Sequence, residues 1–375
     1  MFAKTAHSHF PRRLIAVLTG ALLITGAIPP IIAHAEDTFE CYNGGLTTKA
    51  QAVAYGAVNS TWAGYFDTAR SRWANAGVGA SFAKISFATS SITAGRYSDS
   101  WFGIYMPHGS YYSIKVNIRS LDAKTSNAST FALWSKSTST HELGHALRLP
   151  DNPPTTKTSL MSHSRDRSKV GSPTAYDKAN VKYCLGGLPT RTGSTVGATE
   201  VMSADYPTYD SLADAMSAAD VVVRASLVRS VASVLMPDLS TNTGDARTNP
   251  QYGVRPTAKD LQDLRVPVTV STVQVSETLK GSLKPGQDIK ISQLGGQLDG
   301  VQYREASTTL LANASGDEYL LLLRKRNDGV YEMIGADSGW VVQRGRLTSL
   351  NGQSTNAPFG ATSLPILSRA IDPAR

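Results

Sequence analysis

The spacing of apolar residues predicts a first folded part that mixes helices and strands. Residues 61–76 carry large aromatic residues at helical spacing and are followed by Gly77, so an amphipathic helix is expected there. A second, longer helix is expected at 131–149 and a third at 176–185. Short or alternating apolar runs predict strands at 84–87, 101–106 and 112–119. This order favours an α/β (α+β) domain in which a mixed sheet backs onto the long helix.

The second part of the chain is richer in strand patterns. A helix is expected at 211–219, and strands are expected at 221–228, 266–276, 288–293, 318–324, 330–334 and 340–342. Within the longest of these runs the apolar positions change face near Ser271, which indicates a β-bulge. Residues 236–267 are polar and aperiodic and predict a long surface loop. These patterns favour a mainly-β barrel or sandwich.

The chain length of 375 residues exceeds one ordinary hydrophobic core, so two domains are expected. Glycine, proline and threonine are frequent just after Leu185, and we place a linker at 187–205. The first domain would then span 36–186, and a β-rich accessory domain would span 206–375.

The first 35 residues have the pattern of a secretory signal peptide. Basic residues precede an apolar run at 14–28, and the segment ends in the small-x-small sequence Ala33-His34-Ala35. Pro29, Pro30 and the short apolar core disfavour the alternative of an uncleaved membrane anchor. No later segment is apolar for long enough to span a bilayer. We therefore expect a secreted protein with no membrane association after cleavage.

The net charge is +8 at pH 7, and it is unevenly distributed. Residues 36–190 contain 16 Lys and Arg against 10 Asp and Glu, a balance of +6, whereas 191–375 contain 18 against 19, a balance of −1. The basic residues do not cluster in the runs that are typical of a nucleic-acid surface. No nucleic-acid partner is therefore expected.

Cys41 and Cys184 are the two cysteines of the sequence. In an exported protein such a pair predicts a disulfide, here one that ties the mature N-terminus to the end of the first domain. The alternative is that the Cys41 thiolate blocks a zinc ion and keeps a protease latent. That arrangement would leave Cys184 without a partner.

Residues 141–145 have the sequence His-Glu-Leu-Gly-His. Because residues four apart project from the same face of a helix, His141 and His145 can bind one zinc ion. Glu142 lies beside them and can take a proton from a metal-bound water as that water attacks a carbonyl. The motif therefore indicates metal-dependent hydrolysis. The alternative is an exposed helical turn that carries two incidental histidines.

A catalytic zinc site with two histidines needs a third protein ligand. No glutamate occurs between Leu143 and Thr199, which disfavours a thermolysin-like site with a glutamate ligand on a following helix. Asp151 is the nearest carboxylate, and Pro150 ends the helix just before it and sends the chain out extended. The alternatives are His163, Asp166 and Asp177.

The sequence HELGHALRLPD resembles the zinc helix of the metzincin proteases, and its final aspartate is similar to that of snapalysin, a small secreted bacterial protease group. The resemblance implies that His141, His145 and Asp151 are zinc ligands and that Glu142 is the general base. Arg148 stands where the family has a glycine with positive φ, and a non-glycine residue there costs about 1 kcal/mol.

The resemblance extends over residues 40–185 and assigns further roles. Met161, in the sequence Ser-Leu-Met-Ser, would form the methionine turn beneath the metal. His163 would either donate a hydrogen bond to a tetrahedral intermediate or be a partly exposed loop residue. The strand at 112–119 would pair with an extended peptide substrate. Calcium is compatible with such a protein, but nothing in the sequence indicates it.

The sequence therefore predicts a metzincin-like catalytic domain followed by a mainly-β accessory domain. The implied function is that of a secreted zinc endopeptidase with bacterial-type export, whose partners are protein or peptide substrates. The sequence does not identify a partner for the accessory domain. The alternative is a secreted binding or adhesion protein with a degenerate, weakly active zinc domain.

Overall fold

The computed structural model describes residues 38–186, 199–239, 244–312, 317–351 and Phe359. The expected signal peptide, 1–35, and the first part of the expected linker, 187–198, lie outside the described residues. From Thr38 onward the described residues belong to one compact unit.

Helices and strands alternate in the first part of the chain, as expected. It contains β1 (Ala50–Tyr55), α1 (Ser60–Ala74), β2 (Ser81–Lys84), β3 (Ser91–Gly95), β4 (Gly103–His108), β5 (Tyr111–Asn117), α2 (Ile118–Lys124), α3 (Ala128–Ala146) and α4 (Ala175–Leu185). The expected helices at 61–76, 131–149 and 176–185 correspond to α1, α3 and α4. The mixture of helices with a mixed sheet agrees with the expected α+β class.

Strands dominate the second part. It contains β6 (Thr199–Asp205), α5 (Leu212–Ala218), β7 (Val221–Leu235), α6 (Ala258–Asp263), β8 (Val266–Lys280), β9 (Asp288–Leu298), β10 (Val301–Glu305), β11 (Glu318–Lys325), β12 (Tyr331–Met333), β13 (Gly339–Gln343) and β14 (Arg346–Ser349). Residues 199–205, expected to be part of the linker, form a strand rather than a connection. The expected surface loop at 236–267 contains the short helix α6.

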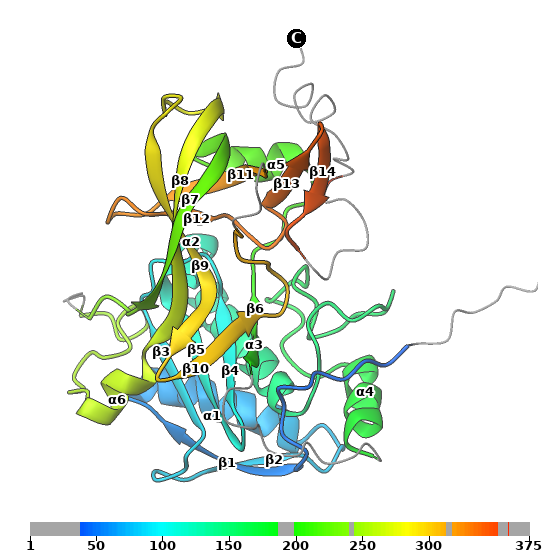
Figure 1. Ribbon diagram of the computed structural model, residues 1–375. Helices are drawn as coiled ribbons and strands as arrows, with labels where there is room; N and C mark the ends of the chain where they lie inside the picture. The colour runs from blue at the N-terminus through cyan, green and yellow to red at the C-terminus, as the bar shows by residue number, and fades with distance from the viewer. Residues whose placement is uncertain (1–37, 187–198, 240–243, 313–316, 352–358, 360–375) are drawn as a thin grey trace, which may run out of the picture. The chain divides into compact units, whose positions relative to one another are not determined.

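The strands of the first part, joined by β6, lie in the order β6-β4-β5-β3-β1-β2. β4 runs antiparallel to both β5 and β6, whereas β1, β2, β3 and β5 pair in parallel. Figure 1 shows β4 and β5 side by side. The expectation that 112–119 pairs with a substrate is wrong, because both edges of β5 are taken by strands of the first part itself, β3 on one side and β4 on the other. Among the strands of the first part, β4 rather than β5 is the last strand on that side of the sheet.

Helix α1 forms because its aromatic residues recur on one face and its start is capped. Asn59 accepts hydrogen bonds from the backbone N–H groups of Thr61 and Trp62. Trp62 and Trp73 are fully buried, and each contributes about 2–3 kcal/mol of apolar burial. The Trp73 indole also donates to the carbonyl of Thr140, 2.8 Å away, which ties α1 to α3 just before the HExxH motif.

Helix α3 is buried although its middle turns are polar. Several of its small hydroxyl residues donate to carbonyls within the helix: Ser135 donates to the carbonyl of Phe131, and Ser139 donates to that of Ser135. Small side chains at these positions allow close packing of the helix backbone against its neighbours. The turn of α3 that carries the HExxH motif is buried.

Five strands of the second part pair in a closed ring, β7-β8-β9-β12-β11, in which the β9–β12 pair is parallel. This order and these directions are those of an OB-fold barrel. Val223, Val273 and Leu321 are among the buried residues of its apolar core. The sequence left a barrel and a sandwich open, and the pairing favours the barrel.

The expected change of face in β8 is present. Val266 and Val268 pack into the cluster that also holds residues of β4 and β6, whereas Val273 and Val275 pack into the barrel core. Of the three register shifts in the β7–β8 pair, the one nearest Ser271 lies on the opposite strand, β7, between Leu227 and Arg229. Strand β8 therefore contributes side chains to two apolar cores, one near its start and the other further along the strand.

The strand expected at 84–87 lies earlier, at 81–84, as β2. Phe87, which suggested a buried strand, is 86% exposed. Within the described residues, no helix is long and apolar enough to cross a membrane.

Candidate metal centre

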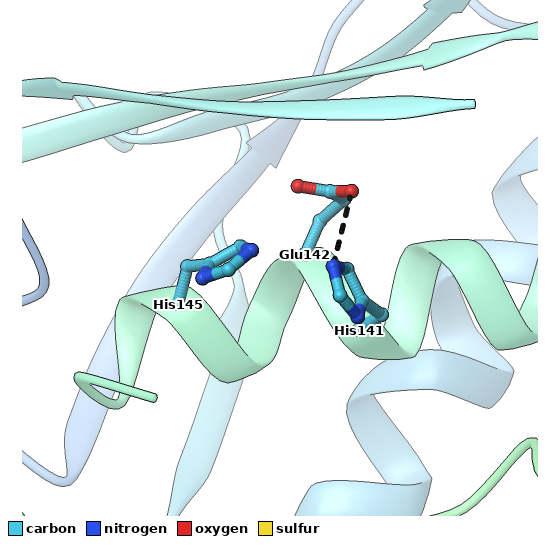
Figure 2. A group of neighbouring side chains, drawn as sticks. All are labelled: His141, Glu142 and His145. Atoms are coloured by element: carbon cyan, nitrogen blue, oxygen red, sulfur yellow. Dashed lines mark ion pairs between the residues drawn. The ribbon is translucent and has the colours of Figure 1, made fainter. Parts of the chain in front are cut away.

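The last two turns of α3 bring His141 and His145 together, with the carboxylate of Glu142 beside them (Figure 2). The two imidazole rings lie 4.9 Å apart between centroids, and both residues are fully buried. The Nδ1 atom of His141 is 3.0 Å from the carbonyl oxygen of Leu160, and that of His145 is 2.8 Å from the carbonyl oxygen of Leu149. A carbonyl only accepts, so each Nδ1 carries the proton and each Nε2 keeps its lone pair for a metal.

The carboxylate of Asp151 lies close to the Nε2 atoms of His141 and His145. Its Oδ1 atom lies 3.0 Å from Nε2 of His141 and 3.3 Å from Nε2 of His145. The backbone turns sharply between α3 and Asp151 because Arg148 adopts φ 70° directly after the C-cap Leu147. Arg148 therefore takes the left-handed conformation that a glycine would adopt without strain.

His163 lies inside the centre rather than on an exposed loop. Its Nε2 atom is 3.1 Å from Oδ1 of Asp151, and the residue is 2% exposed. Asn152 accepts the backbone N–H of His163 with Oδ1 at 2.8 Å, so its amide nitrogen faces Nδ1 of His163 at 3.1 Å. The neutral ring must then accept at Nδ1 and carry its proton on Nε2. His163 is built as a hydrogen-bond donor, unlike the two helical histidines.

Glu142 packs against the backbone of β4. Its Oε1 atom lies so near Gly103 that a Cβ on residue 103 would collide with the carboxylate. Its other neighbour in the centre is Nε2 of His141, 3.9 Å from Oε1. The carboxylate of Glu142, the general base predicted from the sequence, therefore lies between α3 and β4.

Six buried polar atoms around this point have no hydrogen-bond partner among the described residues. They are Nε2 of His141, His145 and His163, Oδ1 of Asp151 and both carboxylate oxygens of Glu142. The nitrogen-to-Oδ1 contacts are within ion-pair distance but lack hydrogen-bond geometry. Each unpartnered buried polar atom costs about 1–3 kcal/mol. A cation held by imidazole nitrogens and a carboxylate oxygen would satisfy several of them at once.

The electrostatics of the centre suit such a cation. Burial, and after it the charge of Arg165, lowers the pKa of His141 to about 4, so the ring is neutral at pH 7. Burial, followed by the negative charges of Asp205 and Asp151, raises the pKa of Glu142 well above its usual value. A positive charge in the centre would oppose that rise and favour the carboxylate form of Glu142.

Met161 lies below the zinc-motif helix, as the resemblance implies. It is 1% exposed, and its sulfur leaves no room for a Cβ on Gly144. The turn is held by Asp177, which accepts from the Ser159 hydroxyl at 2.6 Å and from the backbone N–H of Leu160 at 2.9 Å. Asp177 therefore supports the turn and is not a metal ligand.

The remaining carboxylate alternative for the third ligand lies away from the centre. Asp166 lies on the surface, where it pairs with Lys169 at 3.0 Å. Asp177 also completes a capping box with Thr174 at the start of α4. The spacing of these two residues in the sequence was a signal for that structural role.

The sequence missed Ser203 and Asp205 of β6. The Ser203 hydroxyl donates to Oδ2 of Asp151, and Asp205 forms buried ion pairs with Arg165 and Arg167. Both residues belong to a stretch that had been assigned to the linker. The alternation of polar Ser203 and Asp205 with apolar neighbours was the available signal, but it extends over too few residues to predict a strand.

Cys41 and Cys184 form a disulfide, as predicted. Their Cα atoms are 5.6 Å apart, within the usual range. Cys41 is therefore not a thiolate available to block the metal centre.

Comparisons with known proteins leave the family open. No protein-family model and no curated protein matches the chain. A solved structure titled "GM1 bound form of the ECX AB5 holotoxin" aligns with 40% of this chain and 92% of its own, at 16% identity and a TM-score of 0.32. A likeness at that TM-score carries no argument about function.

Proposed function

We propose that the chain is a secreted zinc-dependent endopeptidase of metzincin type. The observation that carries the proposal is the convergence of unpartnered, buried ligand atoms from His141, His145 and Asp151, with Glu142 beside them. Two neutral imidazoles and one carboxylate are a donor set that suits zinc, whereas magnesium and calcium prefer oxygen ligands. A zinc ion held there would supply a Lewis acid for the carbonyl and lower the pKa of water.

The residues around the ion would divide the work of hydrolysis. Glu142 would take a proton from the attacking water and pass it to the leaving amine. His163, protonated on Nε2, would donate a hydrogen bond to the oxyanion that forms. Asn152 would fix that proton on the correct nitrogen.

An extended peptide is the substrate class that fits the strand beside Glu142. Gly103 of β4 lies against the Glu142 carboxylate. The outer edge of β4 can pair with an antiparallel strand, as its pairing with β6 at Gly103, Ile104 and Tyr105 shows. Backbone pairing at a sheet edge recognises a peptide without requiring a particular side chain. The disulfide agrees with the proposed export to an oxidising environment.

A second candidate is a secreted binding protein whose zinc site is structural. The full burial of His141, Glu142 and His145 favours it, since a catalytic zinc keeps one coordination position open to water or substrate. The two candidates differ in turnover. Chelator-sensitive cleavage of casein, with products read by mass spectrometry, is expected only from the peptidase.

Metal analysis of ligand variants tests the zinc site itself. We expect about one zinc per parent chain and at least tenfold less in H141A, H145A and D151A, because each loses one of few ligands. H108A is the matched control, since His108 lies outside the metal centre and bonds Ser113 and Tyr303. Peptidase activity should disappear with the chelator and return with zinc. A parent chain without zinc, or a D151A variant that retains it fully, would contradict the proposed ligand set.

A further inference from the structure

Strand β6 occupies the outer edge of β4 (Figure 1). The two strands are antiparallel, with Gly103 opposite Asp205 and Tyr105 opposite Ser203. The backbone N–H of Phe102 donates to the carbonyl of Asp205 at 2.8 Å. An extended peptide that added to this edge would make the same kind of backbone ladder, so β6 lies where such a peptide would bind.

The side chains of β6 connect it to the centre itself. Ser203 donates to the Asp151 oxygen that does not face the histidines. Asp205 is fully buried and bonds Arg165 at 2.8 Å through Oδ2, while Arg167 binds Oδ1. Arg167 in turn lies over the ring of Phe102, 4.4 Å from its centroid.

The other end of the strand is also anchored. The hydroxyl of Tyr42 donates to the carbonyl of Val201, and the Tyr42 ring contacts that of His145 with centroids 5.4 Å apart. Met202 and Ala204, which alternate with the residues that face the centre, are buried together with residues of β8 and β9. Both faces of β6 are therefore packed.

Enclosure of the centre follows from this packing. His141, Glu142 and His145 are 0% exposed, and Asp151 is 5% exposed. A general base must come within hydrogen-bond reach of its substrate, which a peptide cannot do while these residues are closed off.

We propose that residues 199–205 act as an internal strand that occupies the peptide-binding edge and keeps the intact chain latent. This inference rests on the proposed function. Activity would require β6 to leave β4, so the rate would scale with the fraction of chains in which that ladder is open. The zinc ligands need not move for the switch to operate.

Weakening β6 in the full chain tests the proposal. The double variant Y42F/D205N removes the hydroxyl bond to Val201 and the charge of Asp205, and leaves the ligands and Glu142 in place. We expect kcat/KM for a fluorogenic peptide to rise at least tenfold, together with the rate of zinc loss to a chelator. E318Q is the matched control, because it makes the same carboxylate-to-amide change in a barrel pair with Arg224 and should leave both rates unchanged.

Unchanged or lower activity in a folded, zinc-loaded Y42F/D205N variant would overturn latency. A parent chain that contains no zinc would instead contradict the proposed function, so the two failures are distinguishable. Because the double variant removes a buried charge and could fold poorly, a second measurement uses the parent chain.

Hydrogen–deuterium exchange of the parent chain with a peptide hydroxamate, a zinc-directed probe, supplies that measurement. At a concentration that abolishes residual activity, the amides of 199–205 should exchange at least tenfold faster, because the probe displaces β6 from β4. The amides of β11 (Glu318–Lys325) serve as the internal control and should not change. Full protection of 199–205 under these conditions would show that β6 does not occupy the peptide's place.

Discussion

At the scale of single residues, hydrogen bonds to the second ring nitrogen separate the histidines of the centre into two kinds. Carbonyl oxygens fix the proton of His141 and His145 on Nδ1, whereas Asn152 fixes that of His163 on Nε2. The first kind can bind a metal through Nε2, and the second can donate from it. The sequence named all three residues as candidates but left His163 open between the centre and an exposed loop. It could not assign the tautomers, because each depends on a neighbour brought in by the fold.

Substitution of His163 tests this division. We expect H163A to retain zinc and to lose about 100–1,000-fold in kcat, with KM little changed, because a donor to the oxyanion is lost. H163Q, whose amide N–H can replace the donor, should recover part of the loss. Loss of zinc from H163A in parallel with activity would identify His163 as a ligand instead.

Arg148 carries the backbone strain that the sequence predicted. With φ at 70°, the residue would be more stable as glycine. Both R148G and R148A lack the arginine side chain. The difference between their unfolding free energies therefore reports the backbone preference at residue 148. We expect R148G to exceed R148A by about 1 kcal/mol in the free energy of urea unfolding. An R148A variant that is equally stable would mean that this position is not strained.

At the scale of elements, predictability followed the length of the pattern. α1 and α3 have several turns of consistent periodicity or a strong motif, and their positions were predicted within a few residues. β1, β3 and β6 are short, and each has only one or two branched residues among Ala, Ser, Gly or charged residues, so they gave no strand signal. They form because neighbouring strands supply the backbone partners, which a local pattern cannot reveal.

His108 joins three strands and should make their assembly sensitive to acid. It bonds Ser113 of β5 at 3.0 Å and the Tyr303 hydroxyl of β10 at 2.7 Å. Burial, and after it the charge of Lys115, lowers the pKa of His108 to about 3. The unfolded chain therefore binds more protons than the folded chain as pH falls from about 6.5 toward 3, and stability is lost over that range.

Replacement of His108 by glutamine should flatten this dependence. Between pH 6.5 and pH 4, we expect the unfolding free energy of the parent to fall by about 2–3 kcal/mol more than that of H108Q. Urea titrations at both pH values measure the difference. Parallel losses in the two proteins would show that His108 is not the group responsible.

At the scale of the whole molecule, the strands of the described residues are connected through one continuous set of pairings. β6 contributes to it by pairing with β4 on one side and with β10 on the other. The sequence predicted an α+β part and a β-rich part, but not that the supposed linker would join them as a strand. Such non-local pairing depends on the complete fold, and it is the feature that encloses the metal centre.

The disulfide acts on this same scale, since Cys41 and Cys184 are separated by 143 residues. Removing such a long crosslink enlarges the conformational freedom of the unfolded chain. We expect C41S/C184S to lose about 2–5 kcal/mol of unfolding free energy. A reductant should lower the thermal midpoint of the parent and leave that of the double serine variant unchanged. Equal midpoints for the oxidised parent and the variant would show that the crosslink is not stabilising.

The central claim is that Glu142 acts as the general base at a zinc site. The most direct test compares kcat/KM for a fluorogenic peptide between the parent and E142Q at equal zinc content. The proposed role of Glu142 predicts that E142Q binds zinc normally and is at least about 100-fold slower. Equal rates at equal zinc content would contradict it.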